Sequence, residues 1–148
     1  MKVVIQRVSE ASVTIDGEIH GKINKGFLLL VGIQDEDTEE VIHKMADKIY
    51  RLRIFEDENE KMNLSLAQVG GEILSISQFT LYADCRKGNR PSFSLAGKPE
   101  YAKKMYLAFN EYLRSLGLKV DEGIFGADMK VRLLNDGPVT ILLDSKEW

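Results

Sequence analysis

The apolar run from Phe27 to Ile33 constrains the fold of this chain more strongly than any other segment. No polar side chain interrupts the run, so neither of its faces is suited to water. Short apolar runs that are bounded by turn residues are typical of strands buried on both faces. The run therefore predicts a central strand of a sheet, with other parts of the chain packed against both faces.

The segment before this run predicts a β-hairpin. Val3 to Ile15 is rich in β-branched residues and stops at Asp16-Gly17, a dipeptide that favours two-residue hairpin turns. The return strand is expected at Glu18 to Ile23, after which residues 24–26 turn the chain into the apolar run. The first part of the chain is therefore expected to be entirely β.

Two amphipathic helices are predicted from the spacing of apolar residues. The first is expected at about Thr38 to Leu52, with Asp37 and Glu40 as a capping box. The second is expected from Pro99 until Gly117 closes it, because proline is favoured at the first helical position and glycine just after the last. Loops are predicted at residues 56–63 and 88–98.

The remainder of the chain is predicted to be β again, at Leu118–Asp121, Met129–Leu134 and Val139–Leu143. Gly137-Pro138 lies between the last two segments. Because proline has no N–H for a sheet ladder, this pair is expected in a turn or at an exposed edge. The order of elements predicts a single α+β domain over residues 1–148, in which a mostly antiparallel, barrel-like sheet carries the two helices.

A second apolar stretch, Ile73 to Leu81, is interrupted by polar residues that include Ser77, Gln78 and Thr80. One interpretation is a core strand that delivers polar groups to its own exposed end, where functional sites are often built. The alternative is an ordinary strand whose serine and threonine side chains form local hydrogen bonds. The pattern alone leaves both interpretations open.

The composition indicates a cytoplasmic protein without membrane contact. No apolar run reaches the roughly 18 residues that a membrane span needs. The N-terminal segment meets charges at Lys2 and Arg7, too early for a secretory signal. Cys85 is the only cysteine, so an intrachain disulfide is impossible, which fits a reducing compartment.

The formal net charge of −3 at pH 7 conceals an uneven distribution. Acidic residues gather at positions 35–40 and 56–60, whereas Glu100 is the only acid between the first and last residues of a basic cluster at positions 86–104. The basic residues of this cluster are Arg86, Lys87, Arg90, Lys98, Lys103 and Lys104. A face of this kind suits a phosphate backbone, although an ordinary solvated surface is the alternative.

The residue types that bind metals and cofactors are scarce. His20, His43 and Cys85 are far apart in sequence, so a zinc site is not expected. No glycine-rich segment has the spacing of a phosphate-binding loop or a dinucleotide fingerprint, so no cofactor is predicted. Ser77, Thr80 and Cys85 are possible nucleophiles, but each is weak unless a base activates it.

Two motifs carry a resemblance to a known family, the D-aminoacyl-tRNA deacylases. These motifs are Ser77-Gln78-Phe79-Thr80 and Asn135-Asp136-Gly137-Pro138-Val139-Thr140. The likeness extends to residues 1–8, to residues 123–129 and to the order of elements over almost the entire chain. Ser77 and Phe79 resemble the bacterial enzymes rather than the animal paralogue.

The resemblance implies an editing hydrolase that acts on the ester between tRNA and a D-amino acid, or glycine mischarged on tRNA-Ala. It also implies a homodimer with active sites at the interface. The family motif assigns catalysis to Ser77, Gln78, Phe79 and Thr80, and pocket lining to Phe125 and Met129. Gly137 and Pro138 of the partner subunit, joined by a cis peptide, are implied to reject L-amino acids through their carbonyl oxygens.

The tRNA is implied to contact the basic cluster, at Arg86, Lys87, Arg90, Lys103 and Lys104. An aminoacyl ester beside a ribose 2′-OH is already labile, so backbone N–H groups near Phe79 and positioning by Gln78 are sufficient without a protein nucleophile. Two alternatives remain. One is a hydrolase that uses Thr80 or Ser77 covalently, and the other is an RNA-binding module without chemistry.

Overall fold

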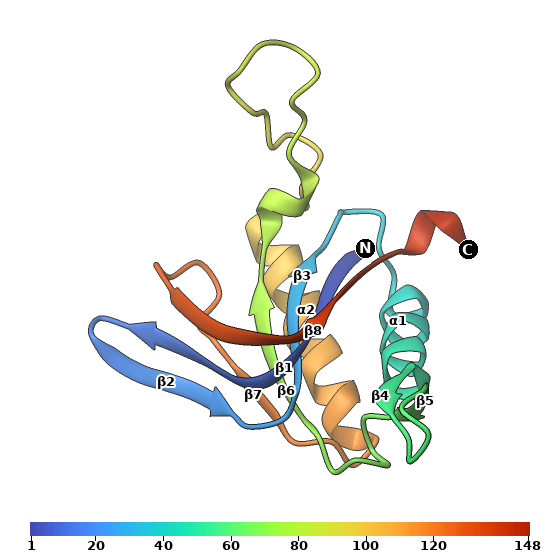
Figure 1. Ribbon diagram of the computed structural model, residues 1–148. Coiled ribbons are helices and arrows are strands. Elements are labelled where there is room, and N and C mark those ends of the chain that lie inside the picture. Colours follow the sequence, from blue (N-terminus) through green and yellow to red (C-terminus); the bar gives the residue numbers. More distant parts are fainter.

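The computed structural model describes residues 1–148 and contains a six-stranded sheet, a two-stranded sheet and two α-helices (Figure 1). The strands of the large sheet are β1 (Lys2–Ile15), β2 (Glu18–Ile23), β3 (Gly26–Gly32), β6 (Glu72–Ser77), β7 (Val120–Glu122) and β8 (Lys130–Asp144). Their order is β2-β1-β3-β6-β7, and β8 pairs with the other edge of β1. The fold is α+β as predicted, with a sheet that is nearly closed into a barrel.

The predicted hairpin and the predicted central strand are both confirmed. β1 and β2 pair antiparallel through a turn in which Asp16 and Gly17 have positive φ angles of 50° and 79°. A turn of this type requires residues that tolerate positive φ at both central positions, which explains the choice of Asp-Gly. The strand β3 lies between β1 and β6, and all but one of its residues are buried.

The two faces of β3 contribute to two different cores. Phe27 and Leu29 point into a large core that includes both helices, whereas Leu28 belongs to a smaller core with Val13 and Leu74. Because side chains alternate between the faces of a strand, one apolar run supplies both cores. The smaller core lies inside the curl of the sheet, where the second half of β1 pairs with β2 on one side and with the first half of β8 on the other.

The sheet is mostly antiparallel, as predicted, but it also contains two parallel pairs of strands. β1 pairs antiparallel with its neighbours, but β3 with β6 and β6 with β7 are parallel. Each parallel pair is joined by a crossover that contains a helix, as parallel neighbours require. The C-terminal ends of β3 and β6 therefore lie at the same edge of the sheet.

The helices α1 (Glu39–Arg51) and α2 (Pro99–Ser115) confirm the two predicted helices, and they contact each other. None of the helices is long and apolar enough to cross a membrane. The predicted capping box was wrong, because Thr38 caps α1 by accepting a hydrogen bond from the Val41 N–H at 3.3 Å. The carboxylate of Asp37 instead accepts hydrogen bonds from the N-terminal ammonium and from the Gln34 N–H, so it does not cap the helix.

A short hairpin, which was not predicted, flanks the first predicted loop and takes up its two ends. β4 (Arg53–Glu56) and β5 (Met62–Ser65) pair antiparallel, so only residues 57–61 form the turn between them. Phe55 is buried and stacks on Phe27 with ring centroids 5.2 Å apart. This contact between distant parts of the chain stabilises a strand that is too short to be predicted from its own pattern.

The strand β6 is shorter than the apolar run that predicted it. It ends at Ser77, and a 3₁₀ turn, η1 (Phe79–Tyr82), takes the place of the expected strand residues 79–81. The Gln78 N–H still donates to the Val31 carbonyl at 2.8 Å, after which the chain turns and buries Tyr82. Only the second half of the turn packs inward, since Leu81 is half-buried and Tyr82 is buried, whereas Phe79 is exposed.

The strand β8 is continuous, which corrects the prediction of two strands separated by a turn. Opposite the single residue Arg7 of β1, β8 contains the four residues 136–139, so it bulges at that point. The Gly137–Pro138 peptide bond in this bulge is cis. Since β8 lies at an edge of the sheet, the expectation of an exposed edge for this pair is confirmed.

Candidate active site

A cavity of about 630 Å³ lies at the shared C-terminal edge of β3 and β6. Five segments form its walls: the end of β3, the end of β6, the loop before α2, the first part of α2, and the segment from Phe125 into β8. Most of the lining residues are hydrophobic, and the polar side chains among them are Ser77, Gln78, Ser94, Lys98 and Tyr106. An apolar pocket with a few polar groups is the usual form of a small-molecule or substrate site.

Three residues of the first motif line this cavity, and the fourth lies beside it. Ser77, Gln78 and Phe79 contribute to the wall directly. Thr80 is exposed and does not line the cavity, but its hydroxyl accepts a hydrogen bond of 2.6 Å from the Gln78 side-chain amide. Because Thr80 occupies the amide N–H₂, the carbonyl oxygen of Gln78 remains available to a ligand.

Two backbone N–H groups beside the cavity, those of Phe79 and Thr80, have no hydrogen-bond partner within the chain. Phe79 and Thr80 are the first two residues of η1, and the first bond of this turn is donated by Leu81 to Gln78. The opening N–H groups of a helical turn have no acceptor within the turn. They are therefore free to donate to an oxygen atom of a ligand, as a helix N-terminus often does for anions.

Aromatic side chains define the apolar part of the cavity. Phe79 is 54% exposed and meets Phe93 edge-to-face, with ring centroids 5.0 Å apart. Tyr106 of α2 is buried, and its hydroxyl donates to the Ser75 carbonyl at 2.7 Å. Burial raises the pKa of Tyr106, so this residue stays a neutral donor that attaches α2 to β6.

The two pocket-lining residues implied by the family resemblance lie on the same wall of the cavity. Phe125 and Met129 follow β7 and precede β8, and both line the cavity. Phe125 lies near Tyr106, with ring centroids 6.1 Å apart. The structure thus brings together five of the six residues that were assigned to catalysis and pocket lining.

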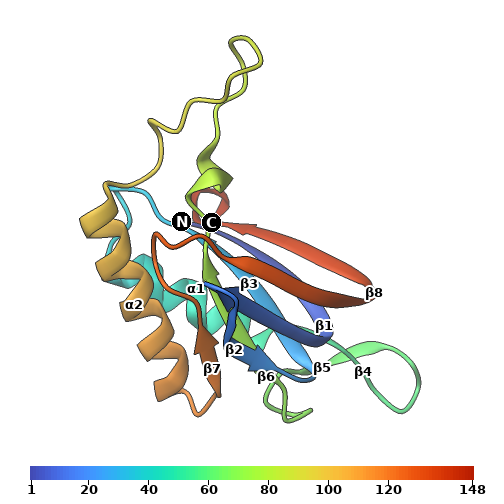
Figure 2. The ribbon, with the colours of Figure 1, turned by 90° about the vertical axis from the view of Figure 1, so that its left-hand side faces the viewer.

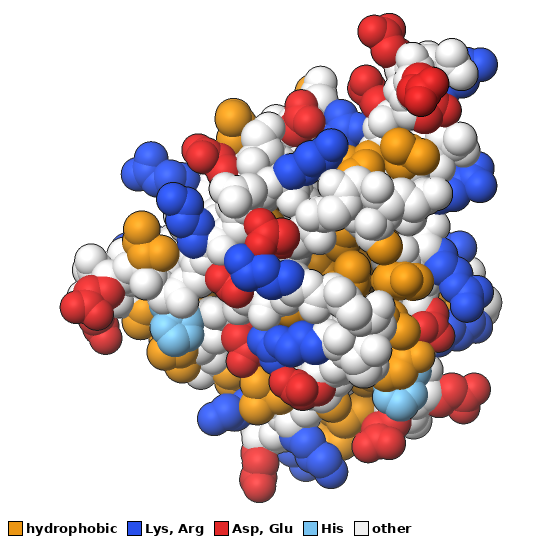
Figure 3. All heavy atoms as spheres, turned by 90° about the horizontal axis from the view of Figure 1, so that it is seen from below, with side chains coloured by type: hydrophobic (Ala, Val, Ile, Leu, Met, Phe, Trp, Pro, Cys, Tyr) orange, Lys and Arg blue, Asp and Glu red, His pale blue; other side chains and the backbone are white.

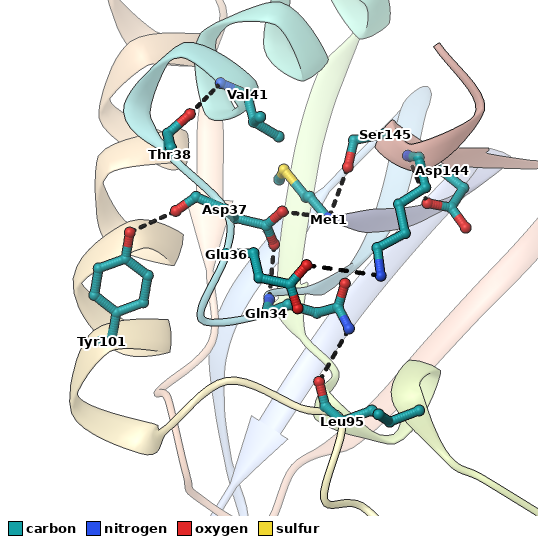
Figure 4. Close-up of polar contacts among 11 residues, drawn as sticks. Met1, Gln34, Glu36, Asp37, Thr38, Val41, Leu95, Tyr101, Asp144 and Ser145 are labelled. Carbon is teal, nitrogen blue, oxygen red and sulfur yellow. Dashed lines mark hydrogen bonds and ion pairs between the residues drawn. The ribbon is translucent and has the colours of Figure 1, made fainter.

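The segment from Phe93 to Lys98 forms one wall, and hydrogen bonds attach it to the loop that follows β3. The Gly97 N–H donates to the Ile33 carbonyl at 2.8 Å. The side chain of Gln34 donates to the Leu95 carbonyl at 3.1 Å (Figure 4). Two chain segments that are far apart in sequence are therefore held at the rim of the cavity.

A buried ion pair lies behind this wall (Figure 4). The Met1 ammonium donates to the Asp37 carboxylate at 2.6 Å and to the Ser145 hydroxyl at 2.8 Å. The other oxygen of Asp37 accepts from the Gln34 N–H at 2.7 Å, and the Tyr101 hydroxyl donates to the Asp37 carbonyl. Asp37 thus joins the N-terminus, α2 and the loop that supports the cavity wall.

Gly137 and Pro138 do not line the cavity of their own chain. They lie beside Arg7, whose buried guanidinium donates to the carbonyls of Asp136 at 3.0 Å and Ile54 at 2.7 Å. Gly137 has a φ of 136°, and a Cβ at this position would lie 2.8 Å from a methyl carbon of Val139. A second copy of the chain is therefore needed if this pair is to reach a cavity.

The predicted cationic residues divide into two groups. Arg86 forms an ion pair of 2.8 Å with Asp84, and its hydrogen bond lowers the pKa of Asp84 to about 2. Lys87 and Arg90 are exposed on the loop that extends away from the rest of the molecule (Figures 1 and 2). Lys103 and Lys104 are exposed on α2.

The face of the molecule seen in Figure 3 lies at the opposite end from the loop that carries Lys87 and Arg90. On this face, acidic and basic side chains are interspersed.

Neither histidine lines the cavity. His43 is stacked on Tyr112 with ring centroids 4.1 Å apart, and His20 is exposed on β2. The cavity residues that the sequence analysis missed are contributed mainly by the loop and by α2, with Phe93, Lys98 and Tyr106 as examples. Phe93 is the only aromatic residue among residues 88–98, and this isolated aromatic side chain is the one sequence signal that could have marked it as a cavity residue.

The fold and the cavity together define a class of small α+β proteins whose mixed sheet carries an apolar pocket at the ends of two parallel strands. Comparison with known proteins places the chain within this class. A family model described as D-Tyr-tRNA(Tyr) deacylase matches residues 4–144. The chain belongs to this family.

A curated relative agrees with this assignment, and two solved structures share the fold. The chain is 60% identical to a "D-aminoacyl-tRNA deacylase" of Halothermothrix orenii, over 99% of both chains. A solved structure described as "c-Myc DNA Unwinding Element Binding Protein" has a TM-score of 0.91 at 46% identity, covering 97% of this chain and 98% of that one. Another, described as "a probable eukaryotic D-amino acid tRNA deacylase", shares the fold with a TM-score of 0.83 at 17% identity, covering 96% and 97%.

Proposed function

We propose that the protein is an editing enzyme that hydrolyses the ester of D-aminoacyl-tRNA, releasing free tRNA and the D-amino acid. The proposal rests on family membership and on one observation in particular. The Ser77–Thr80 motif places unpaired backbone N–H groups and an amide side chain at the mouth of an apolar cavity. The same cavity contains no histidine that would activate a nucleophile.

In this proposal, water attacks the ester carbonyl, and the tetrahedral oxyanion is stabilised by the N–H groups of Phe79 and Thr80. Gln78 orients the substrate through its carbonyl oxygen. The ribose 2′-OH of the terminal adenosine assists as a proton relay, because it accepts a proton from the attacking water and donates its own proton to the leaving 3′-oxygen. Oxyanion stabilisation by fixed N–H groups is worth about 10² to 10³ in rate per donor, so the protein needs no covalent step.

A covalent mechanism through Thr80 has less support. A hydroxyl needs a neighbouring base to become a nucleophile, and the group bonded to the Thr80 hydroxyl is the Gln78 amide, which is a donor. Ser77 lines the cavity, but neither histidine does. A protein that only binds RNA would have no use for free N–H groups at the mouth of an amino-acid-sized cavity.

Selection against L-amino acids is proposed to require a homodimer. The strand β8 has a free edge, and Leu134 and Leu142 on it are each 57% exposed. Exposed apolar residues along an unpaired edge favour association with another chain. The partner's Gly137 and Pro138 would then reach the cavity and exclude an L side chain with their carbonyl oxygens. Glycine has no side chain, so glycyl-tRNA(Ala) would also be hydrolysed.

The proposal is tested by incubating the purified protein with D-tyrosyl-, L-tyrosyl- and glycyl-tRNA and following the loss of each ester. We expect rapid loss of the D-ester and the glycyl ester and a background rate for the L-ester. Protein that binds tRNA but leaves all three esters intact would be an RNA-binding module. Equal rates for the D- and L-esters would contradict chiral selection.

A further inference from the structure

A basic groove lies on α1, away from the cavity and from the cations that the family resemblance assigned to tRNA. Its lining residues are Lys44, Asp47, Lys48, Arg51, Leu52, Arg53 and Trp148. Four of these seven residues are cations, whereas the chain as a whole carries a net charge of −3. We refer to this surface as the α1 groove.

The cations of the α1 groove are not neutralised by the protein itself. None of Lys44, Lys48, Arg51 and Arg53 forms an ion pair within the chain. The single acid of the groove, Asp47, accepts a hydrogen bond of 2.9 Å from the Tyr112 hydroxyl. By contrast, Arg86, Arg114, Lys119, Lys130 and Lys146 each have an acidic partner.

The spacing of these cations suits a linear polyanion. Lys44, Lys48 and Arg51 are four and three residues apart, so they lie on one face of the helix. At 1.5 Å of rise per residue, this row extends about 10 Å along the helix axis. Such a row can meet consecutive phosphates of one nucleic-acid strand, whereas a single small anion would need only one or two of the cations.

An aromatic side chain completes the surface. Trp148 is 44% exposed, and the Lys44 ammonium lies 4.8 Å from the centre of its indole ring. An exposed aromatic ring among cations is the arrangement that binds single-stranded nucleic acid, because bases stack on the ring while cations hold the backbone. The groove thus favours RNA over an acidic protein or an anionic membrane, neither of which offers a base to the ring.

The α1 groove is connected to the rim of the cavity. Trp148 directly follows η2 (Ser145–Glu147), and the Ser145 hydroxyl holds the same Met1 ammonium that binds Asp37 (Figure 4). Asp37 in turn binds Gln34, which supports the cavity wall. A chain of hydrogen bonds through the buried ion pair therefore connects the groove with the wall of the cavity.

We propose that the α1 groove is a second RNA-binding surface, which holds an unpaired segment of the tRNA substrate at a distance from its aminoacylated 3′ end. This inference rests on the proposed function for its substrate. It adds a contact that the cavity and the loop cations do not supply. The groove contributes affinity for the RNA body and takes no part in ester hydrolysis.

The inference is tested with Lys48→Gln/Arg51→Gln, compared with Lys22→Gln/Lys25→Gln, which removes the same charge from the β2 side. Trp148 is the only tryptophan, so its emission reports directly on the groove. We expect tRNA, but not the trinucleotide CCA, to change the emission of the wild-type protein. In the groove variant, the log–log salt dependence of tRNA binding should fall by roughly 1.4 to 1.8, since each lost contact contributes 0.7 to 0.9.

Hydrolysis of a minimal substrate, D-tyrosyl-adenosine, should be equal in both variants and the wild type. A groove variant with the salt dependence of the control would overturn the inference, as would emission that responds to phosphatidylserine vesicles and not to tRNA. A wild-type protein that leaves D-tyrosyl-adenosine and D-tyrosyl-tRNA intact would instead contradict the proposed function. In that case the salt dependence would still decide whether the groove binds RNA.

Discussion

At the scale of single residues, the site depends on hydrogen bonds that fix backbone groups more than on reactive side chains. Gln78 is held by its N–H bond to Val31 and by its amide bond to Thr80. The hydroxyl of Tyr106 fixes the carbonyl of Ser75, which lies two residues before the motif. These contacts place N–H groups at the cavity while leaving no activated hydroxyl or thiol in it.

Thr80→Ala tests whether the hydroxyl reacts. If Thr80 only orients Gln78, the rate of D-tyrosyl-tRNA hydrolysis should fall by less than the roughly 10² to 10⁴ that loss of an acid–base partner causes. Gln78→Ala, which removes the oriented group itself, should lower the rate at least as much. Both are measured in single-turnover experiments, and trapping of an acyl-enzyme in the wild type would show that the hydroxyl is a nucleophile.

Asp37 is the residue whose loss should affect stability most. Its carboxylate and the Met1 ammonium are 2.6 Å apart and almost fully buried. Removing one partner of a buried ion pair leaves an uncompensated charge and destabilises a protein by about 3–5 kcal/mol. We expect Asp37→Ala to lower the free energy of unfolding by this amount in urea titrations, and the exposed control Glu39→Ala to change it by less than about 1 kcal/mol. Similar values for both variants would contradict the role given to Asp37.

At the scale of elements, the starts of three strands are joined by one carboxylate, at the opposite end of β6 from the cavity. Glu72 accepts from Lys119 at 2.6 Å and from the Asn24 N–H at 3.0 Å. These residues precede β7 and β3, respectively. The hydrogen bond from Lys119 is the main cause that lowers the pKa of Glu72 below its ordinary value of 4.5, and the Asn24 N–H adds to it.

This pKa shift predicts a pH dependence of stability. A carboxyl group with a lowered pKa in the folded state contributes stability above its unfolded pKa, and this contribution is lost as the pH falls through the folded-state value. Glu72→Gln should therefore be less stable than the wild type at pH 7, and the difference should disappear well below pH 4.5. Urea unfolding at both pH values measures it, with the exposed Glu58→Gln as the control. A difference that persists unchanged in acid would contradict the assignment.

The elements that could be predicted from sequence are those specified by local chemistry. Asp16-Gly17 specifies a hairpin turn, Pro99 specifies a helix start, and the run at 27–33 specifies a buried strand. The strand β4 could not be predicted, because Phe55 is held by Phe27 from a distant part of the chain. The cavity could not be predicted for the same reason, because Phe93 and Tyr106 approach the Ser77–Thr80 motif only in the folded chain.

At the scale of the whole molecule, the Gly137–Pro138 pair and the cavity lie apart within one chain. Gly137 and Pro138 lie on the bulge of β8 beside Arg7, whereas the cavity lies at the other end of β3. The family resemblance implied that this pair acts in the cavity of a partner subunit, and the fold keeps the pair away from the cavity of its own chain. The proposed homodimer supplies this connection.

Leu142→Glu tests the dimer. A charge on the exposed free edge should convert the protein to a monomer in analytical ultracentrifugation and remove its preference for D- over L-tyrosyl-tRNA, because the partner's pair is lost. Ile19→Glu introduces the same charge at a residue that is 63% exposed on β2 and should change neither property. A monomeric Leu142→Glu protein with the wild-type preference would show that selectivity does not need the partner.

The most direct test of the central claim, that the RNA and the backbone of the protein together supply the chemistry, is a single-turnover comparison of two substrates. One is D-tyrosyl-tRNA with a normal terminal adenosine, and the other ends in 2′-deoxyadenosine with the ester on its 3′-oxygen. If the 2′-OH transfers the proton, the deoxy substrate should bind equally well but react slower by roughly the 10² to 10⁴ that a positioned acid–base group contributes. Equal rates on the two substrates would contradict the account, because the protein would then have to contain the missing acid–base group.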